Sequence, residues 1–357
     1  MSMKLTLLNK SFIPVLVTTL SLSVGLSACG GKDSGDKPAA SVEPSTSSRA
    51  TATLTPAPQP KNWPLNGLEV NGEVGPAVAV KIENSKEARP QSGLEQADLV
   101  WEELVEGGIT RFIAVYNSQL PAAIGPIRSV RPTDSRILSP LGGLVAFSGG
   151  QAPFIQAVKD EGLQVISFDA GDAGFYRTKD RKAPHNVYGN LSEFLAQAKN
   201  TAPPATQFIF ATSASESLVA QSTETATSIQ TTFSGYAKPN WTFDGGSGKY
   251  LRFEGQTPAK ANSGEQLSAT NVIALKVPIV QTKYVDPAGT PVPDTQLIGE
   301  GEAMVFTGGK AQRGTWKKSQ ASSVLKVLTD DGLDITLAPG NTWVELVPQK
   351  EGVISYQ

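Results

Sequence analysis

The chain has a single cysteine, Cys29, among its 357 residues, so no disulfide can form within it. A folded part without disulfides must be stabilised by its hydrophobic core, which requires domains of ordinary globular size. The chain also has 34 glycines and 25 prolines, a composition that favours strands and turns over long helices. We therefore expect short elements joined by frequent turns.

The residues that precede Cys29 resemble a bacterial lipoprotein signal. Lys4 and Lys10 are followed by an apolar segment from 12 to 26 and then by small residues. This segment is shorter than the ~20 residues that a membrane-spanning helix needs. The pattern predicts a signal peptide over residues 1–28 and a lipidated Cys29 as the first residue of the mature protein.

The predicted lipid determines the expected location of the protein. A single acyl chain binds a membrane only reversibly, so we expect the diacyl modification of lipobox proteins, with palmitate, on Cys29. We predict an extracytoplasmic protein of the cell envelope, held in the cell membrane by the lipid on Cys29. Membrane lipid is therefore the first expected partner.

Residues 29–62 are predicted to be a disordered tether. From Ser41 to Pro60, 15 of 20 residues are Ser, Thr, Pro or Ala, with no aromatic residue. A segment with so little apolar surface cannot offset the conformational entropy that folding removes. It would hold the folded part away from the membrane.

Two domains are expected after the tether. Over residues 63–205, predicted strands such as 77–82 and 144–147 alternate with helices at 151–161 and 191–199, which indicates a mixed α/β domain. Over residues 236–350, short strands are separated by turns such as Asp331-Gly332 and Pro339-Gly340, which indicates a small all-β domain. The predicted fold class is therefore α+β.

Gly107-Gly108 is predicted to be the two-residue turn of a hairpin formed by residues 98–105 and 109–116. That turn would pair Leu104 with Arg111. Arg111 would then lie diagonal to Glu102 and Glu106 on one face of the hairpin, within ion-pairing reach.

The candidate site residues are mostly basic and lie in three motifs of the first domain: 88–93, 125–132 and 181–186. Arginine presents a planar fork that fits carboxylate and phosphate, and a helix N-terminus favours negative charge. We predict a site for an anionic envelope ligand, and its residues are Arg89, Arg128, Arg131, Arg181, His185 and Asn186. The alternative is that the arginines form structural ion pairs with Asp98, Glu102, Glu103, Glu106 or Asp134.

A second alternative is catalysis. Ser148 lies in Phe147-Ser148-Gly149-Gly150 between a predicted strand and a predicted helix, and His185 lies further along the chain. This order weakly resembles a nucleophile elbow, although 37 residues between Ser148 and His185 are too few for that hydrolase fold. Asp169 or Asp172 would complete such a triad. His185 with a carboxylate, or with Ser148, would then serve a cell-wall-directed hydrolase or transferase.

Other classes of site are disfavoured by composition. Basic and acidic side chains number 31 and 33, so no global field favours nucleic acid. With one histidine and no free thiol, the sequence predicts no metal site and no cofactor. Trp241, Trp316 and Trp343 could stack on sugars, but such residues in a small β unit more often form its core.

Several of these motifs, taken in their order, resemble the YerB-like lipoprotein family. In the first half they are Ala88–Leu94, Leu104–Phe112, Gly125–Pro132 and Arg181–Asn186, and in the second half Gly314–Trp316 and Pro339–Trp343. The resemblance implies an envelope lipoprotein with two domains of unknown function, and it brings no catalytic residues. The stretch from Thr257 to Asn262 lacks the His and Asp that this family often carries there.

We therefore expect a lipid-anchored binding protein whose ligand is an anionic envelope component. The sequence leaves two further functions open: the cell-wall enzyme described above, and a scaffold for an envelope protein complex.

Overall fold

The computed structural model describes residues 60–357 of the chain. The predicted signal peptide, the lipidation at Cys29 and the tether up to residue 59 lie outside the described residues.

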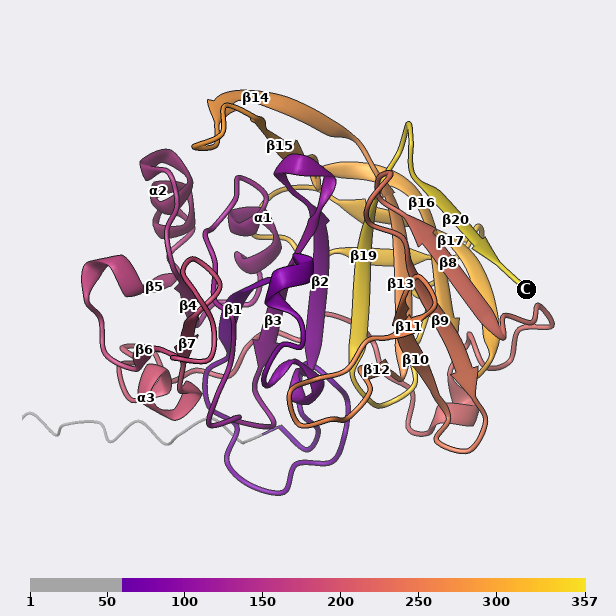
Figure 1. The fold of residues 1–357 in the computed structure, drawn as a ribbon. Helices are drawn as coiled ribbons and strands as arrows, with labels where there is room; N and C mark the ends of the chain where they lie inside the picture. Colours follow the sequence, from indigo (N-terminus) through magenta and orange to yellow (C-terminus); the bar gives the residue numbers. More distant parts are fainter. Residues whose placement is uncertain (1–59) are drawn as a thin grey trace, which may run out of the picture. The chain divides into compact units, whose positions relative to one another are not determined.

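A ten-stranded sheet runs through both halves of the described chain (Figure 1). Its order is β18–β17–β16–β13–β19–β2–β3–β1–β4–β5. Its strands are β1 (Val78–Glu83), β2 (Leu99–Leu104), β3 (Thr110–Tyr116), β4 (Leu144–Phe147), β5 (Gln164–Ser167), β13 (Asn271–Val277), β16 (Gly299–Thr307), β17 (Lys310–Lys318), β18 (Lys326–Leu328) and β19 (Thr342–Pro348).

A second sheet packs beside the part of the ten-stranded sheet that contains β13 and β19. Its main order is β11–β10–β9–β8–β20, with β12 paired to β10. These strands are β8 (Ser228–Thr232), β9 (Pro239–Asp244), β10 (Lys249–Glu254), β11 (Thr257–Pro258), β12 (Ser268–Ala269) and β20 (Val353–Tyr356). Two small antiparallel pairs complete the strands, namely β14 (Ile279–Val285) with β15 (Pro291–Thr295) and β6 (Phe175–Arg177) with β7 (Val187–Gly189).

Helices are short in the described chain: α1 (Asp134–Leu138), α2 (Ala152–Asp160) and α3 (Leu191–Leu195), together with five 3₁₀ turns. Helix α3 begins where the side chain of Asn190 accepts a hydrogen bond from the backbone N–H of Glu193, which is the usual role of an N-cap residue. Helices α2 and α3 lie inside the ranges that the sequence predicts.

The predicted fold class is wrong. The described chain is mostly β, and the strands of the second half do not form a separate small β domain. Strand β19 instead inserts beside β2 in parallel, with Val344 opposite Trp101, and β13 pairs with β19 on its other side. Strand β19 is buried along its whole length, as is typical of a parallel strand covered on both faces. The two predicted domain boundaries remain predictions.

Two hydrophobic cores lie on opposite faces of the ten-stranded sheet. One contains Val80 and Ile82 of β1 together with Trp241 of the second sheet. The other contains Ala79 of the same strand together with residues of α1 and α2, such as Leu138 and Phe154. Successive side chains of a strand point to opposite faces, so each central strand contributes to both cores.

The predicted register of the hairpin is wrong by one residue. The backbone N–H of Val105 donates to the carbonyl of Ile109, and a 3₁₀ turn (Glu106–Gly108) fills the loop between them. Leu104 therefore pairs with Thr110, and Arg111 lies opposite Glu103. Because the side-chain period of a strand is two, this shift moves Arg111 to the face opposite Glu102.

Candidate functional site

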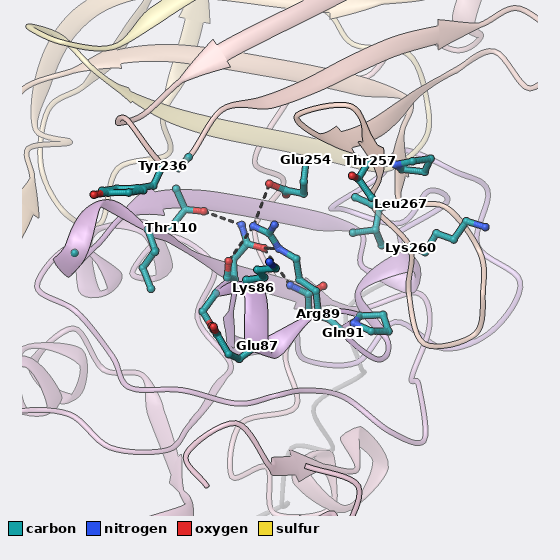
Figure 2. Close-up of a pocket in the computed structure, with 18 residues that line it drawn as sticks. Lys86, Glu87, Arg89, Gln91, Thr110, Tyr236, Glu254, Thr257, Lys260 and Leu267 are labelled. Atoms are coloured by element: carbon teal, nitrogen blue, oxygen red, sulfur yellow. Dashed lines mark hydrogen bonds and ion pairs between the residues drawn. The ribbon is translucent and has the colours of Figure 1, made fainter. Parts of the chain in front are cut away.

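A cavity of about 790 Å³ opens beside the loop that follows β1 (Figure 2). Residues from both sequence halves line it, and they are Asn84–Glu87, Arg89–Gln91, Gly107, Ile109, Thr110, Tyr236, Ala237, Glu254, Thr257–Lys260 and Leu267. Arg89 and Glu254 face each other across its middle, with Tyr236 on one side and Lys260 on the other (Figure 2). We call this cavity the pocket.

Arg89 is held in the pocket by three contacts. Its Nε donates to the side-chain oxygen of Asn84 at 3.0 Å and its Nη2 to the backbone carbonyl of Asn84 at 3.0 Å. Nη2 also lies 3.0 Å from Oε2 of Glu254. Within the described chain, Nη1 of Arg89 has no hydrogen-bond partner. Partial burial lowers the pKa of Arg89, an effect that Glu254 opposes.

The contacts of Arg89 belong to a closed ring of six side chains at the base of the pocket. Asn84 donates to Thr110 at 2.8 Å, and Thr110 donates to Glu102 at 2.7 Å. Glu102 and Glu254 both accept hydrogen bonds from Arg252, at 3.1 and 2.9 Å. A closed network of this kind holds its members in one geometry, so Arg89 is presented to the pocket in a preset position.

Arg252 lies at the centre of a group that we call the arginine cage. Its guanidinium is fully buried and contacts carboxylates of Glu102, Glu254 and Glu345. The rings of Phe112, Trp241 and Trp343 surround it, with centroid distances of 5.4, 5.2 and 4.7 Å. Burial lowers the pKa of Arg252, but the three carboxylates outweigh burial and hold it above its usual value.

The opposite face of the sheet holds a second buried group, the lysine cluster. The ammonium of Lys81 pairs with Glu103 and lies 2.7 Å from Oδ1 of Asp134. Arg111 lies on the same face and donates to the carbonyl of Ser129 at 3.1 Å, while its Nε has no hydrogen-bond partner in residues 60–357. Burial and the nearby Arg131 and Arg128 lower the pKa of Arg111 to about 9.

Two of the predicted site residues converge on Glu83, the last residue of β1. Nδ1 of His185 lies 2.9 Å from Oε2 of Glu83, and Nε of Arg128 lies 3.5 Å from Oε1. Ser85 donates to Oε1 as well, at 3.1 Å. Glu83 is nearly fully buried, whereas His185 and Arg128 are partly exposed. We call Glu83, His185 and Arg128 the histidine group.

The other predicted site residues have separate surroundings. Arg131 is buried and forms an ion pair with Glu106 at 2.8 Å, one of the structural pairs that the sequence leaves open. Arg181 donates to the carbonyls of Glu87 and Pro90 on the outer side of the loop that lines the pocket. Asn186 accepts from Arg177 and donates to the carbonyl of Thr178. Arg89 is the member of the predicted set that lines the pocket.

The residues of the alternative triad have other partners. Asp169 accepts from the backbone N–H of Gly149, and Asp172 accepts from the backbone N–H of Ser167 at 2.7 Å. Both aspartates therefore stabilise loops. The carboxylate that contacts His185 is Glu83, which the sequence analysis did not consider.

Trp241, Trp316 and Trp343 are at least 98% buried. They form part of the core and cannot stack on a sugar at the surface. The aromatic side chain that lines the pocket is Tyr236.

The sequence analysis missed Arg252, Glu254 and Tyr236. Arg252 had a detectable signal: in the strand Lys249–Glu254 it alternates with Tyr250, so both point to the same, inward face. An inward arginine requires buried acidic partners. No comparable signal distinguishes Tyr236.

The described residues contain no group of three or more His, Cys, Asp or Glu side chains that could hold a metal ion. The pocket instead combines apolar walls with a fixed arginine, which suits an organic anion rather than a cation.

Fold and site together define a β-rich protein in which one sheet passes through both sequence halves and a pocket with a fixed arginine opens beside it. Residues 65–204 match the family model described as "Protein of unknown function (DUF3048) N-terminal domain", and residues 229–344 match the model of its C-terminal domain. The chain belongs to this family, as the resemblance to YerB-like proteins predicted.

Two comparisons with individual proteins agree with this family. The chain is 28% identical over 304 residues to "Putative lipoprotein YerB" of Bacillus subtilis (strain 168), over 80% of this chain and 86% of that protein. It also resembles the crystal structure of the YerB protein from Bacillus subtilis, with a TM-score of 0.70 and 24% identity over 82% of this chain and 99% of that one. The second comparison supports the fold alone.

The named relative supports the prediction of a lipoprotein at the level of the family. Among the helices of residues 60–357, none has the length and apolar character that crossing a membrane requires.

Proposed function

We propose that this chain is an envelope lipoprotein, anchored through an acylated Cys29 on the extracytoplasmic face of the membrane, that binds an anionic ligand in the pocket. The observation that carries the proposal is the pattern of contacts made by the guanidinium of Arg89. Its guanidinium is fixed by Asn84 and Glu254, while its Nη1 has no partner in the described residues. A fixed and incompletely paired guanidinium is a preorganised donor for carboxylate or phosphate.

The test uses the full-length chain in detergent micelles and a panel of carboxylated and phosphorylated envelope fragments, each beside its neutral counterpart. Calorimetric titration should detect binding of one or more acids that weakens as salt is raised. Arg89→Gln should weaken that binding by about tenfold or more, because a charge-assisted hydrogen bond is lost. The exposed Arg313→Gln is the matched control. Equal binding of neutral and acidic fragments would disprove the proposal.

The histidine group favours a second candidate function, a cell-wall hydrolase or transferase. A buried carboxylate on Nδ1 of His185 orients the ring and leaves Nε2 able to take a proton from an attacking hydroxyl. Turnover of cell-wall material by the full-length chain should then be lost in His185→Gln and strongly reduced in Glu83→Gln. Turnover that survives His185→Gln in a folded protein would exclude this role.

A further inference from the structure

We propose that the ligand of the pocket is an acidic saccharide, a sugar ring that carries a carboxylate or a phosphate. This inference rests on the proposed function and specifies the class of ligand. Three features of the pocket support it: an exposed aromatic ring at its rim, an excess of unpaired cations, and a lining that combines apolar and polar side chains.

The first feature is Tyr236, whose side chain is 86% exposed although it lines the pocket. Its backbone is held by Ser234, whose hydroxyl accepts from the N–H groups of Tyr236 and Ala237 and donates to the carbonyl of Gly108. The ring lies over Gly108, where an added Cβ would come within 3.2 Å of it. An aromatic residue whose backbone is fixed at a rim and whose ring is left uncovered provides a flat apolar face for a ligand ring.

The second feature is the charge around the pocket. Lys86 and Lys260 are exposed, and neither forms an ion pair within residues 60–357. Of the two lining carboxylates, Glu254 is already paired with Arg252 and Arg89, which leaves Glu87. The unpaired groups therefore carry more positive than negative charge, so the pocket favours an acidic ligand.

The third feature distinguishes a sugar from a flat aromatic acid. Pro90, Ile109 and Pro258 contribute apolar surface to the lining, and Thr257 and Lys86 contribute hydrogen-bonding groups. A sugar has an apolar C–H face and a rim of hydroxyls, so it can contact both kinds of lining group at once, whereas a flat aromatic acid would leave the polar groups without a hydrogen-bond partner. A volume of about 790 Å³ is within the usual range for organic ligands.

The experiment measures binding of three related probes to the full-length chain in detergent micelles. N-Acetylmuramic acid carries both the ring and an acid, N-acetylglucosamine carries the ring without the acid, and lactate carries the acid without the ring. We expect N-acetylmuramic acid to bind at least about tenfold more tightly than either fragment, because it meets both the cations and the aromatic ring. N-Acetylglucosamine 1-phosphate distinguishes the source of the acid: tighter binding than N-acetylmuramic acid would indicate a phosphate-bearing saccharide.

Variants locate the binding. Tyr236→Ala should weaken binding of the preferred acidic sugar by about three- to tenfold, the usual range for an aromatic contact, and should leave lactate binding unchanged. Because Tyr236 packs on so little, the variant should fold normally. Tyr176→Ala is the matched control, since Tyr176 is 43% exposed and does not line the pocket. Lys260→Gln should weaken both acidic sugars but not N-acetylglucosamine.

The outcomes separate this inference from the proposed function. If N-acetylglucosamine binds as tightly as the acidic sugars, or if Tyr236→Ala leaves their binding unchanged, the saccharide class is wrong. If lactate or a non-sugar acid binds as tightly and needs Arg89, the saccharide class is again wrong, but the anion-binding function stands. If neither these probes nor the wider panel of acids binds, both proposals fail.

Discussion

Glu102 and Glu103 are neighbours in β2, yet they lie in two different buried environments on opposite faces of the sheet. Glu102 belongs to the arginine cage, where a fully buried guanidinium contacts three carboxylates and three aromatic rings. Glu103 belongs to the lysine cluster, where one ammonium contacts two carboxylates. Both arrangements bury charge, but they differ in how the acidic excess is accommodated.

In the arginine cage the acidic excess is relieved partly by Arg89, whose guanidinium pairs with Glu254. Burial and the neighbouring Glu102 raise the pKa of Glu345 to about 7, although Arg252 opposes the shift. In the lysine cluster, burial raises the pKa of Glu103 and Lys81 opposes the shift. The cage is also connected to the pocket, because Glu254 contacts both Arg252 and Arg89. The charge state of the cage therefore affects the electrostatic environment of the pocket. No residue of the lysine cluster lines the pocket.

Removal of the cation from the cage should have the largest effect. Arg252→Met would leave three carboxylates, those of Glu102 and Glu345 fully buried, without their shared partner. Loss of one partner of a buried ion pair costs about 3–5 kcal/mol, and we expect the upper end of that range. Urea unfolding monitored by tryptophan fluorescence measures the change. The exposed Arg313→Met should change the free energy of unfolding little.

Removal of the cation from the lysine cluster should have a smaller effect. Lys81→Met would leave Glu103 and Asp134 buried, but their repulsion can be relieved by one proton. We expect a loss near 3 kcal/mol at neutral pH, decreasing at lower pH as Glu103 is protonated. Urea unfolding at several pH values tests this order, and a larger loss for Lys81→Met than for Arg252→Met would contradict it.

Glu345→Gln should show how much of the pH dependence of stability comes from the arginine cage rather than from the lysine cluster. The raised pKa of Glu345, about 7 instead of 4.5, means that the folded state binds more protons than the unfolded state between these values. The free energy of unfolding should therefore fall as pH rises through this window, by an amount on the order of 3 kcal/mol.

In Glu345→Gln most of that fall should disappear. Part should remain, because burial also raises the pKa of Glu103 and Asp98. Thermal unfolding from pH 5 to pH 8 provides the measurement. An unchanged slope in Glu345→Gln would mean that Glu345 is ionised throughout this range.

The smallest loss of stability is expected when the hydrogen bonds that link the arginine cage to the pocket are removed. Thr110→Val keeps the shape of the side chain but removes the hydrogen bonds to Glu102 and from Asn84. We expect a loss of about 1–2 kcal/mol, together with weaker binding of the pocket ligand as Asn84 and Arg89 lose their fixed positions. The exposed Thr257→Val should cost less stability. A Thr110→Val protein with unchanged binding would show that the ring does not position Arg89.

Much of the local structure could be predicted from the sequence. The strands near 78–83, 99–104 and 144–147 and the helices α2 and α3 follow from apolar runs and turn residues, which are local signals. The hairpin register could not be predicted in this way. Gly107 and Gly108 suggest a two-residue turn, but both adopt positive φ within a longer loop, and the extra residue moves Arg111 to the other face.

The candidate site was predicted only in part, because its residues have local signals but their partners do not. Arg89, Arg128 and His185 are recognisable from their motifs. Their partners are distant along the chain, however: Glu254 is 165 residues from Arg89, and Glu83 is 45 residues from Arg128 and 102 from His185. The sequence by itself determined which segments extend as strands, where turns interrupt them, and which family the motifs resemble, because these depend on neighbouring residues. Only the tertiary structure decided that β19 joins β2 and that Arg252 reaches Glu102, because strand pairing and ion pairing between distant segments depend on the packing of the whole chain.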